Sequence, residues 1–112
     1  MTGRGGGLTE MATSIYDTDV SAEVTGSVFE DDAGSTGTAC LCHALGSGGT
    51  LTVQRLMGSS GQWVDISSEA VTAATPLFLI YDAPLVETRA KFNPTTTASL
   101  IEVEFWSRGG RE

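Results

Sequence analysis

Hydrophobic and polar residues alternate with a period of two along much of the chain. The alternation is clear in residues 20–24, 86–92 and 100–107. A period of two places successive side chains on opposite faces of a strand and is typical of strands that are buried on one face. Because no segment of ten or more residues shows the 3.6-residue period of an amphipathic helix, the pattern indicates an all-β protein.

Glycine-rich turns separate the strand-like segments. The clearest pair, residues 50–56 and 63–67, flanks the sequence GSSG at 58–61, and this order predicts a hairpin. The mostly apolar segments 38–44 and 77–81 are typical of buried strands. The sequence therefore predicts a small antiparallel β-sandwich or barrel of six to eight short strands.

The last two predicted strands can be aligned as a second hairpin. A turn centred on residues 96–97 pairs Lys91 with Glu102 and Arg89 with Glu104, and it places apolar residues opposite one another on the other face. The period of two also predicts which side chains form the core between the sheets: Val53, Val64, Ile66, Leu79, Ala90, Phe92, Ile101, Val103 and Phe105.

Three segments are expected along the chain. Residues 1–19 are glycine-rich at their start and predict a flexible N-terminal arm that contributes almost nothing to folding. Residues 20–108 form the β-sandwich domain, and residues 109–112 form a short tail. The arm nevertheless contains more apolar side chains than a linker needs, so we expect it to become ordered against a neighbouring subunit through Leu8, Met11, Ile15 and Tyr16.

The charge distribution restricts the possible partners. The net charge is −8, and residues 8–54 contain seven acidic side chains and no Lys or Arg. A surface that binds phosphates needs the opposite sign, so we expect no direct contact with nucleic acid. The acidic residues favour either a solvated face or a face that meets a basic partner. No apolar run is long enough to span a membrane, and the N-terminus lacks the apolar centre of a secretory signal, so we expect the chain to fold in a cytoplasm.

Few residues have metal-binding or catalytic potential. Cys40 and Cys42 precede His43, but the chain has no other Cys or His to complete a zinc site unless several subunits contribute ligands. We expect two reduced thiols, at least one of them buried. The carboxylates at 17–19 and 30–32 lack the spacing of a calcium loop and are expected to be exposed in turns. Because no nucleophile motif or phosphate loop is present, we expect no enzyme activity, cofactor or metal.

Trp63 and Trp106 are the remaining candidates for binding. Two tryptophans could form a platform on which sugar rings stack, or they could pack against a neighbouring element or subunit. The second interpretation is favoured, and Trp63 is expected to face away from the core.

The predicted hairpin combines an alternating strand, a Gly-rich turn and a Trp-containing return strand: Leu51, Val53, Gln54, Arg55, Gly58, Gly61, Trp63, Val64, Asp65 and Ile66. The later sequence ETRA at 87–90 is followed by a Thr-rich turn and a closing strand. Over residues 36–107 this order resembles that of small virion proteins of tailed bacteriophages. In that group the hairpin belongs to β-sandwich modules of capsid decoration, head-fibre and tail proteins.

The resemblance implies a non-enzymatic virion structural protein. Its expected function is to bind the outer capsid surface in many copies and stabilise the head, as a decoration (cement) protein assembled in the host cytoplasm. Its expected partners are the major capsid protein or other virion proteins, with a homo-oligomer on the particle. The alternatives are a head-fibre, collar or tail module, and a carbohydrate-binding β-sandwich module.

Overall fold

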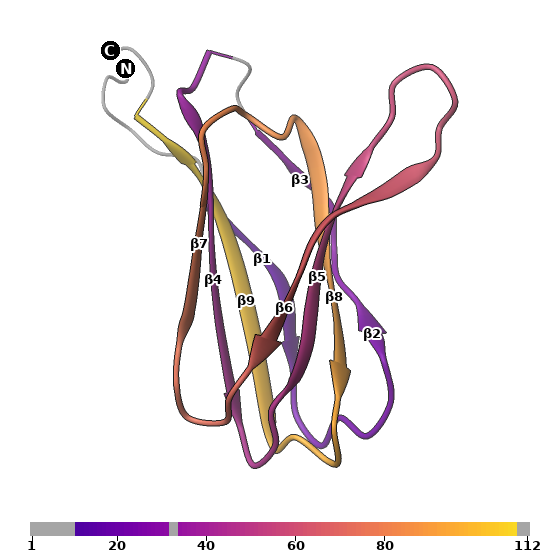
Figure 1. Cartoon of the computed structure of the whole chain (residues 1–112), viewed down its shortest axis with the longest axis vertical. Coiled ribbons are helices and arrows are strands. Elements are labelled where there is room, and N and C mark those ends of the chain that lie inside the picture. The colour runs from indigo at the N-terminus through magenta and orange to yellow at the C-terminus, as the bar shows by residue number, and fades with distance from the viewer. Residues whose placement is uncertain (1–10, 32–33, 110–112) are drawn as a thin grey trace.

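Two antiparallel β-sheets form the structure, a computed structural model that describes residues 11–31 and 34–109. The four-stranded sheet has the order β1 (Met11–Asp17), β9 (Leu100–Arg108), β4 (Gly37–Leu45), β7 (Leu77–Tyr81). The five-stranded sheet has the order β2 (Val24–Thr25), β8 (Glu87–Pro94), β5 (Gly49–Leu56), β6 (Trp63–Val71), and β3 (Phe29–Glu30) also pairs with β8. The sheets face each other in two layers (Figure 1), which confirms the predicted all-β sandwich. The described residues contain no helix long and apolar enough to cross a membrane.

The core lies between the sheets and follows from the alternation along each strand. In β9 every second residue, from Ile101 to Ser107, is buried, and the residues between them are partly exposed. Phe105 stacks on Phe29 of β3 with ring centroids 6.0 Å apart. The predicted core residues that are fully buried are Val53, Ala90, Phe92, Ile101, Val103 and Phe105, and Leu79 packs against them while partly exposed.

Two residues predicted for the core, Val64 and Ile66, are instead exposed, with 43% and 40% of their surfaces accessible. They lie on β6 in the hairpin with β5, which is present as predicted. The pairing register shifts between Val53 and Gln54, which interrupts the strict alternation. The pairing of β5 with β8 ends at Arg55, which is opposite Val64, and beyond Arg55 the hairpin extends away from the sandwich (Figure 1).

The predicted hairpin between the last two strands is wrong. β8 pairs with β5, β2 and β3 in one sheet, and β9 pairs with β1 and β4 in the other. Lys91 Nζ lies 3.5 Å from Glu23 Oε2 instead of meeting Glu102, and Arg89 Nε donates to Gln54 Oε1 at 2.8 Å instead of meeting Glu104. The alternation of apolar and polar residues indicates which face of a strand is buried. It does not show whether two strands pair within one sheet or face each other across the core, because both arrangements bury the same residues.

Part of the predicted arm belongs to the sandwich. Met11–Asp17 forms β1, which pairs with β9 at the edge of the four-stranded sheet. Ile15 is only 4% exposed in the core, and Ser14 Oγ donates to the carbonyl of Ser27 at 2.9 Å. A flexible arm extending to residue 19 is therefore wrong for this segment, because edge pairing and burial of Ile15 offset the cost of ordering it. Residues 1–10, with Leu8, and residues 110–112 of the predicted tail lie outside the described residues.

Cys40 and Cys42 are successive inward-facing residues of β4, with Leu41 between them. Both are buried free thiols, as expected for reduced cysteines. Burial raises the pKa of Cys42 from 9.0 to about 12. Burial, followed by the charge of Cys42, also raises the pKa of Cys40. The core therefore holds both thiols in the neutral form.

A core truncation should be far more costly than the same truncation on the outer surface. We expect Phe105→Ala to lower the free energy of unfolding by about 3–5 kcal/mol, because its ring is fully buried. The matched control is Phe78→Ala, whose ring is half-exposed on β7 and whose loss should cost about 1 kcal/mol or less. Urea unfolding measures both, and equal losses would contradict the assignment of Phe105 to the core.

Neighbouring residues of β1 provide a test of its place in the sandwich. Ile15→Ala should destabilise the isolated protein by about 2–5 kcal/mol, because Ile15 is buried. Tyr16→Ala should change stability by about 0.5 kcal/mol or less, because Tyr16 points to solvent. Thermal or urea unfolding of each variant makes the comparison, and a neutral effect of Ile15→Ala would show that β1 is not part of the folded domain.

The buried thiols predict a loss of stability at alkaline pH. Their pKa values are raised in the folded state, so the folded chain retains protons that the unfolded chain releases. The stabilisation is complete below the ordinary pKa of 9.0 and is lost as the pH rises toward about 12, by about 3 kcal/mol per thiol at pH 11.

The matched control for this test is the double variant Cys40→Ala/Cys42→Ala. Burial also raises the pKa of Tyr81 from 10.0, so both proteins share that part of the alkaline decline. Urea unfolding from pH 8 to pH 11 should show a shallower decline for the double variant. Identical slopes would mean that the thiols ionise as readily in the folded chain as in the unfolded one.

Candidate interaction surface

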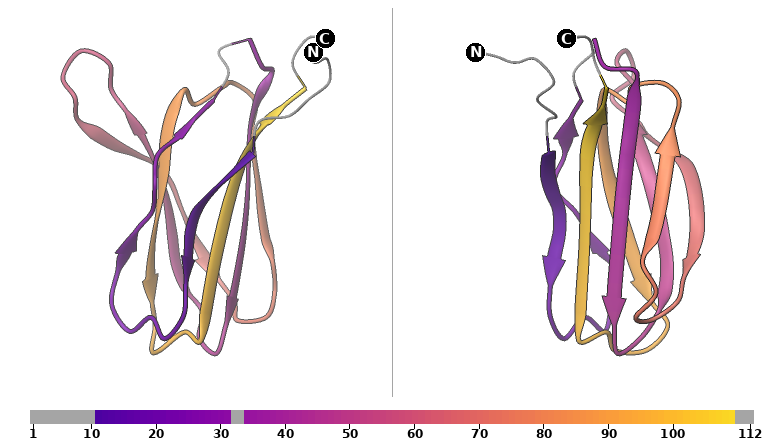
Figure 2. Two further views of the ribbon diagram at one scale, coloured as in Figure 1. Left: turned by 180° about the vertical axis from the view of Figure 1, so that it is seen from behind. Right: turned by 90° about the vertical axis from the view of Figure 1, so that its left-hand side faces the viewer.

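The outer face of the four-stranded sheet carries an unusual number of apolar side chains. Figure 2 shows its strands side by side in the order β1, β9, β4, β7. The pairing aligns outward-facing residues in a row across all four strands: Met11, Trp106, Ala39 and Ile80. In the adjacent row Thr13, Glu104, Leu41 and Phe78 are aligned in the same way. The face therefore presents an apolar band across the width of the sheet.

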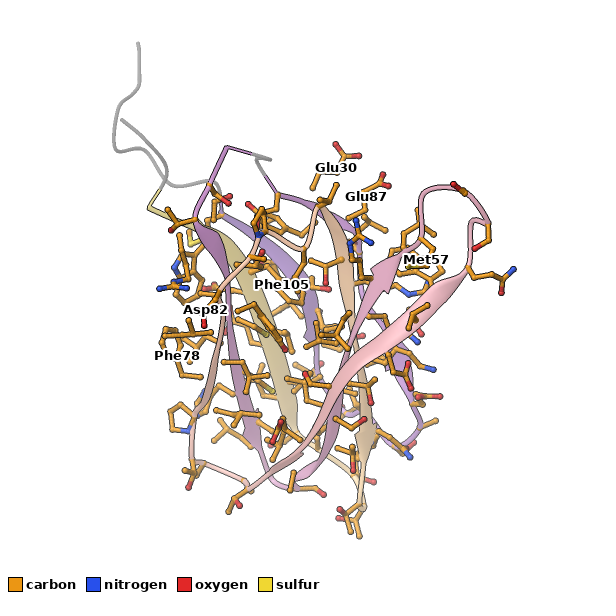
Figure 3. The ribbon with its side chains drawn as sticks, turned by 45° about the horizontal axis from the view of Figure 1, so that its top comes forward. Glu30, Met57, Phe78, Asp82, Glu87 and Phe105 are labelled. Carbon is orange, nitrogen blue, oxygen red and sulfur yellow. The ribbon has the colours of Figure 1, made fainter. Side chains whose placement is uncertain are left out.

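Several of these apolar side chains are exposed to solvent. Met11 is 67% exposed, and Phe78 and Ile80 are each 51% exposed. The rings of Phe78 and Trp106 stack with centroids 5.6 Å apart and an interplanar angle of 29°. Figure 3 shows Phe78 outside the ribbon and Phe105 between the sheets. We call the surface formed by Met11, Leu41, Phe78, Ile80 and Trp106 the Trp106 face.

Two carboxylates of the central strand β9 lie beside these apolar groups. Glu104 is paired across the sheet with Leu41 and Thr13, and Glu102 with His43 and Tyr16. A hollow of about 220 Å³ is lined by Leu41, His43, Pro76, Glu102 and Glu104. A second hollow of about 380 Å³ is lined by Met11, Leu41, Glu104 and Trp106. Because both hollows share Leu41 and Glu104, they form one continuous uneven surface.

Neither the Glu102 nor the Glu104 carboxylate has a hydrogen bond or ion pair with another side chain that the structure describes. The two ion pairs within residues 11–31 and 34–109 are Lys91 with Glu23 and Arg108 with Asp82, each at 3.5 Å. Glu102 and Glu104 are each partly exposed. The Trp106 face thus combines exposed apolar groups with carboxylates that no other described side chain pairs.

The outer face of the five-stranded sheet has a different character. The guanidinium of Arg89 lies 4.1 Å from the centre of the Trp63 ring, a cation–π contact. Gln54 accepts a hydrogen bond from Arg89 and donates one to Asp65 Oδ1 at 2.8 Å. Thr52 and Ser68 are hydrogen-bonded at 2.9 Å on the same hairpin. The polar groups of this face are therefore paired with one another.

The predicted binding residues occupy three different places. Met11, Tyr16 and Trp106 share the outer face of the four-stranded sheet. Ile15 lies in the core and is not available to a partner, because the alternation along β1 turns it away from Tyr16. Trp63 belongs to the other sheet, so the two tryptophans do not form one platform.

Sequence reasoning missed the contribution of β7 to this surface. The sequence LFLIY is apolar at every position, so it predicts a strand buried on both faces. In the structure Leu77, Leu79 and Tyr81 pack against the core, while Phe78 and Ile80 point outward. In the sequence the only sign of this surface is that Phe78 and Ile80, which alternate with the inward residues of β7, are also apolar. Which of the two alternating sets faces outward becomes evident only when the positions of the sheets are known.

The structure places His43 and Cys42, the candidates for metal binding, on opposite faces of β4. His43 alternates with Cys42 along β4 and faces outward, so the two side chains cannot share an ion. The described residues contain no group of three or more His, Cys, Asp or Glu side chains positioned to hold a metal.

Asp31 was expected to be exposed in a turn, but it is buried. Its carboxylate accepts hydrogen bonds from the hydroxyls of Ser35, Thr38 and Ser107. The Thr38 hydroxyl in turn accepts from the backbone amide of Leu85 at 2.9 Å. These bonds connect one end of β4 and β9 to the turn before β8, which gives Asp31 a structural role.

Comparison with solved structures shows which proteins share this fold. XepA, described as a PBSX exported protein, has a TM-score of 0.66 at 13% identity, over 95% of this chain and 38% of that one. A protein of Bacillus endospore appendages, described as disulfide-linked pili, has a TM-score of 0.56 at 10% identity, over 93% of this chain and 88% of that one. The Yersinia pseudotuberculosis-derived mitogen has a TM-score of 0.52 at 14% identity, over 94% of this chain and 91% of that one.

These similarities concern the fold alone, because all three identities are low. This chain spans less than half the length of XepA. No protein-family model matches the sequence, and no curated protein matches it. The chain is thus a β-sandwich whose fold also occurs in an exported protein, in a pilus protein and in a mitogen.

Proposed function

We propose that this chain is a non-enzymatic structural protein of a virion, which binds the outer capsid surface in many copies through its Trp106 face. The observation that carries the proposal is the exposure of Met11, Phe78 and Ile80 on one face of a hydrogen-bonded sheet. Exposed apolar patches of this kind mark interaction sites. The proposed role is that of a decoration protein that bridges capsid subunits.

Burial of the exposed apolar side chains of the Trp106 face would provide free energy for binding to another protein. Burying an exposed Phe or Ile side chain contributes about 1.5–3 kcal/mol relative to leaving it in water. The side chains project from paired strands, so docking orders little backbone and loses little entropy.

Two further observations support this role. The sequence of residues 36–107 resembles that of small virion modules of tailed bacteriophages. The same fold occurs in a protein described as forming pili, so this sandwich architecture is compatible with assembly into larger structures. A carbohydrate-binding role receives less support, because Trp63 and Trp106 lie in different sheets and each already contacts another side chain.

The proposal predicts that one charge placed on the Trp106 face abolishes incorporation into particles. Ile80→Asp should fold normally, since Ile80 is half-exposed on an edge strand, but its occupancy on purified particles should fall at least tenfold. Val64→Asp is the matched control, an exposed β-branched residue on the edge strand of the other sheet, and it should retain occupancy. Quantitative mass spectrometry of the particles measures both variants.

The same measurement separates the positions that a virion protein can take. A copy number that matches the capsid subunits supports decoration, whereas a few copies per particle favour a head-fibre, collar or tail module. Absence of the wild-type protein from purified particles would refute the virion role. Unchanged occupancy of Ile80→Asp would move the attachment site away from the Trp106 face.

A further inference from the structure

The two carboxylates of the Trp106 face define the chemistry of its partner. Glu102 and Glu104 are successive outward-facing residues of β9, so their Cα atoms are about 7 Å apart along the strand. A guanidinium or ammonium group placed above the strand between them can reach both carboxylates. The indole of Trp106 is the next outward side chain on the same strand, and with Phe78, on which it stacks, it extends the apolar surface beside the two carboxylates.

Docking would change the surroundings of these carboxylates. Glu102 and Glu104 are partly exposed and line a hollow together with Leu41. An apolar partner that covered the face would remove water from both carboxylates and leave them unpaired, which is strongly unfavourable. A partner that supplies a positive charge at this place avoids that cost, and its apolar neighbours can contact Met11 and Phe78.

We infer that the Trp106 face binds a protein surface that presents an Arg or Lys side chain between apolar residues, with the cationic group between Glu102 and Glu104. This inference rests on the proposed role as an attached structural protein, and it specifies the partner's contacting residues. Within the described residues the chain supplies no such cation itself, because Arg108 pairs with Asp82 and donates to the carbonyl of Tyr81 at 3.0 Å.

A second copy of this chain does not fit the face. A two-fold contact joins identical patches, so it would bring Glu102 and Glu104 of both copies into one interface. The net charge of −8 adds repulsion between the copies at longer range. The charge arrangement therefore favours a basic partner protein over self-association.

Peptide selection on the isolated protein tests the inference without knowledge of the partner. The full chain is immobilised, and a displayed library of random peptides constrained as β-hairpins is selected against it. We expect at least tenfold enrichment of sequences that carry Arg or Lys flanked by apolar residues. The double variant Glu102→Lys/Glu104→Lys should reverse this preference and select Asp or Glu at the same place.

The matched control carries the same change of charge on the other sheet. Glu69→Lys/Glu87→Lys alters β6 and β8 and should select the same basic peptides as the wild type. The isosteric variant Glu102→Gln/Glu104→Gln should bind a selected peptide at least tenfold more weakly, with a smaller dependence on salt. Circular dichroism and melting temperature establish that each variant is folded.

Several outcomes would overturn the inference. Selected peptides without basic residues, no enrichment above background, or a preference that is not reversed in Glu102→Lys/Glu104→Lys would each contradict it. So would dimerisation of the wild type in sedimentation experiments that Phe78→Asp abolishes. Because these measurements need no particle, a failure here is distinguishable from a failure of the virion role, which particle occupancy tests separately.

Discussion

The two sheets are held together by an apolar interior to which the main strands each contribute a row of side chains. Phe105 of β9 and Phe92 of β8 belong to different sheets and are both fully buried in this interior. Because a strand turns alternate residues to opposite sides, each inward row requires an outward row of the same length. The core therefore determines which residues remain on the two outer surfaces.

The outer surfaces of the two sheets differ in how far their side chains pair with one another. On the five-stranded sheet Arg89, Gln54 and Asp65 form a connected network, and Trp63 lies under the Arg89 guanidinium. On the four-stranded sheet the exposed apolar groups and two carboxylates lack comparable partners within the described residues. This asymmetry is the basis of the proposal that the four-stranded sheet contacts another molecule.

A buried group of polar side chains around Asp31 lies at one end of the sandwich, beside the apolar core. Asp31 is buried there with three hydroxyl donors, and its backbone amide donates to the carbonyl of Val86 at 2.6 Å. Val86 has a φ of +63°, a conformation that a β-branched residue adopts only when its surroundings impose it. The hydrogen bonds around Asp31 hold the turn before β8 and so help to fix where that strand joins its sheet.

The all-β class, the β5–β6 hairpin and most of the buried positions could be predicted from the amino-acid pattern, because a period of two is a local property of each strand. The pattern also gave Met11, Tyr16 and Trp106 as candidates for contact. The placement of β8 and β9 in opposite sheets and the exposure of Phe78 became evident only from the arrangement of the strands in space. Alternation indicates which side of a strand is buried, but the neighbour of each strand depends on contacts between residues far apart in the chain.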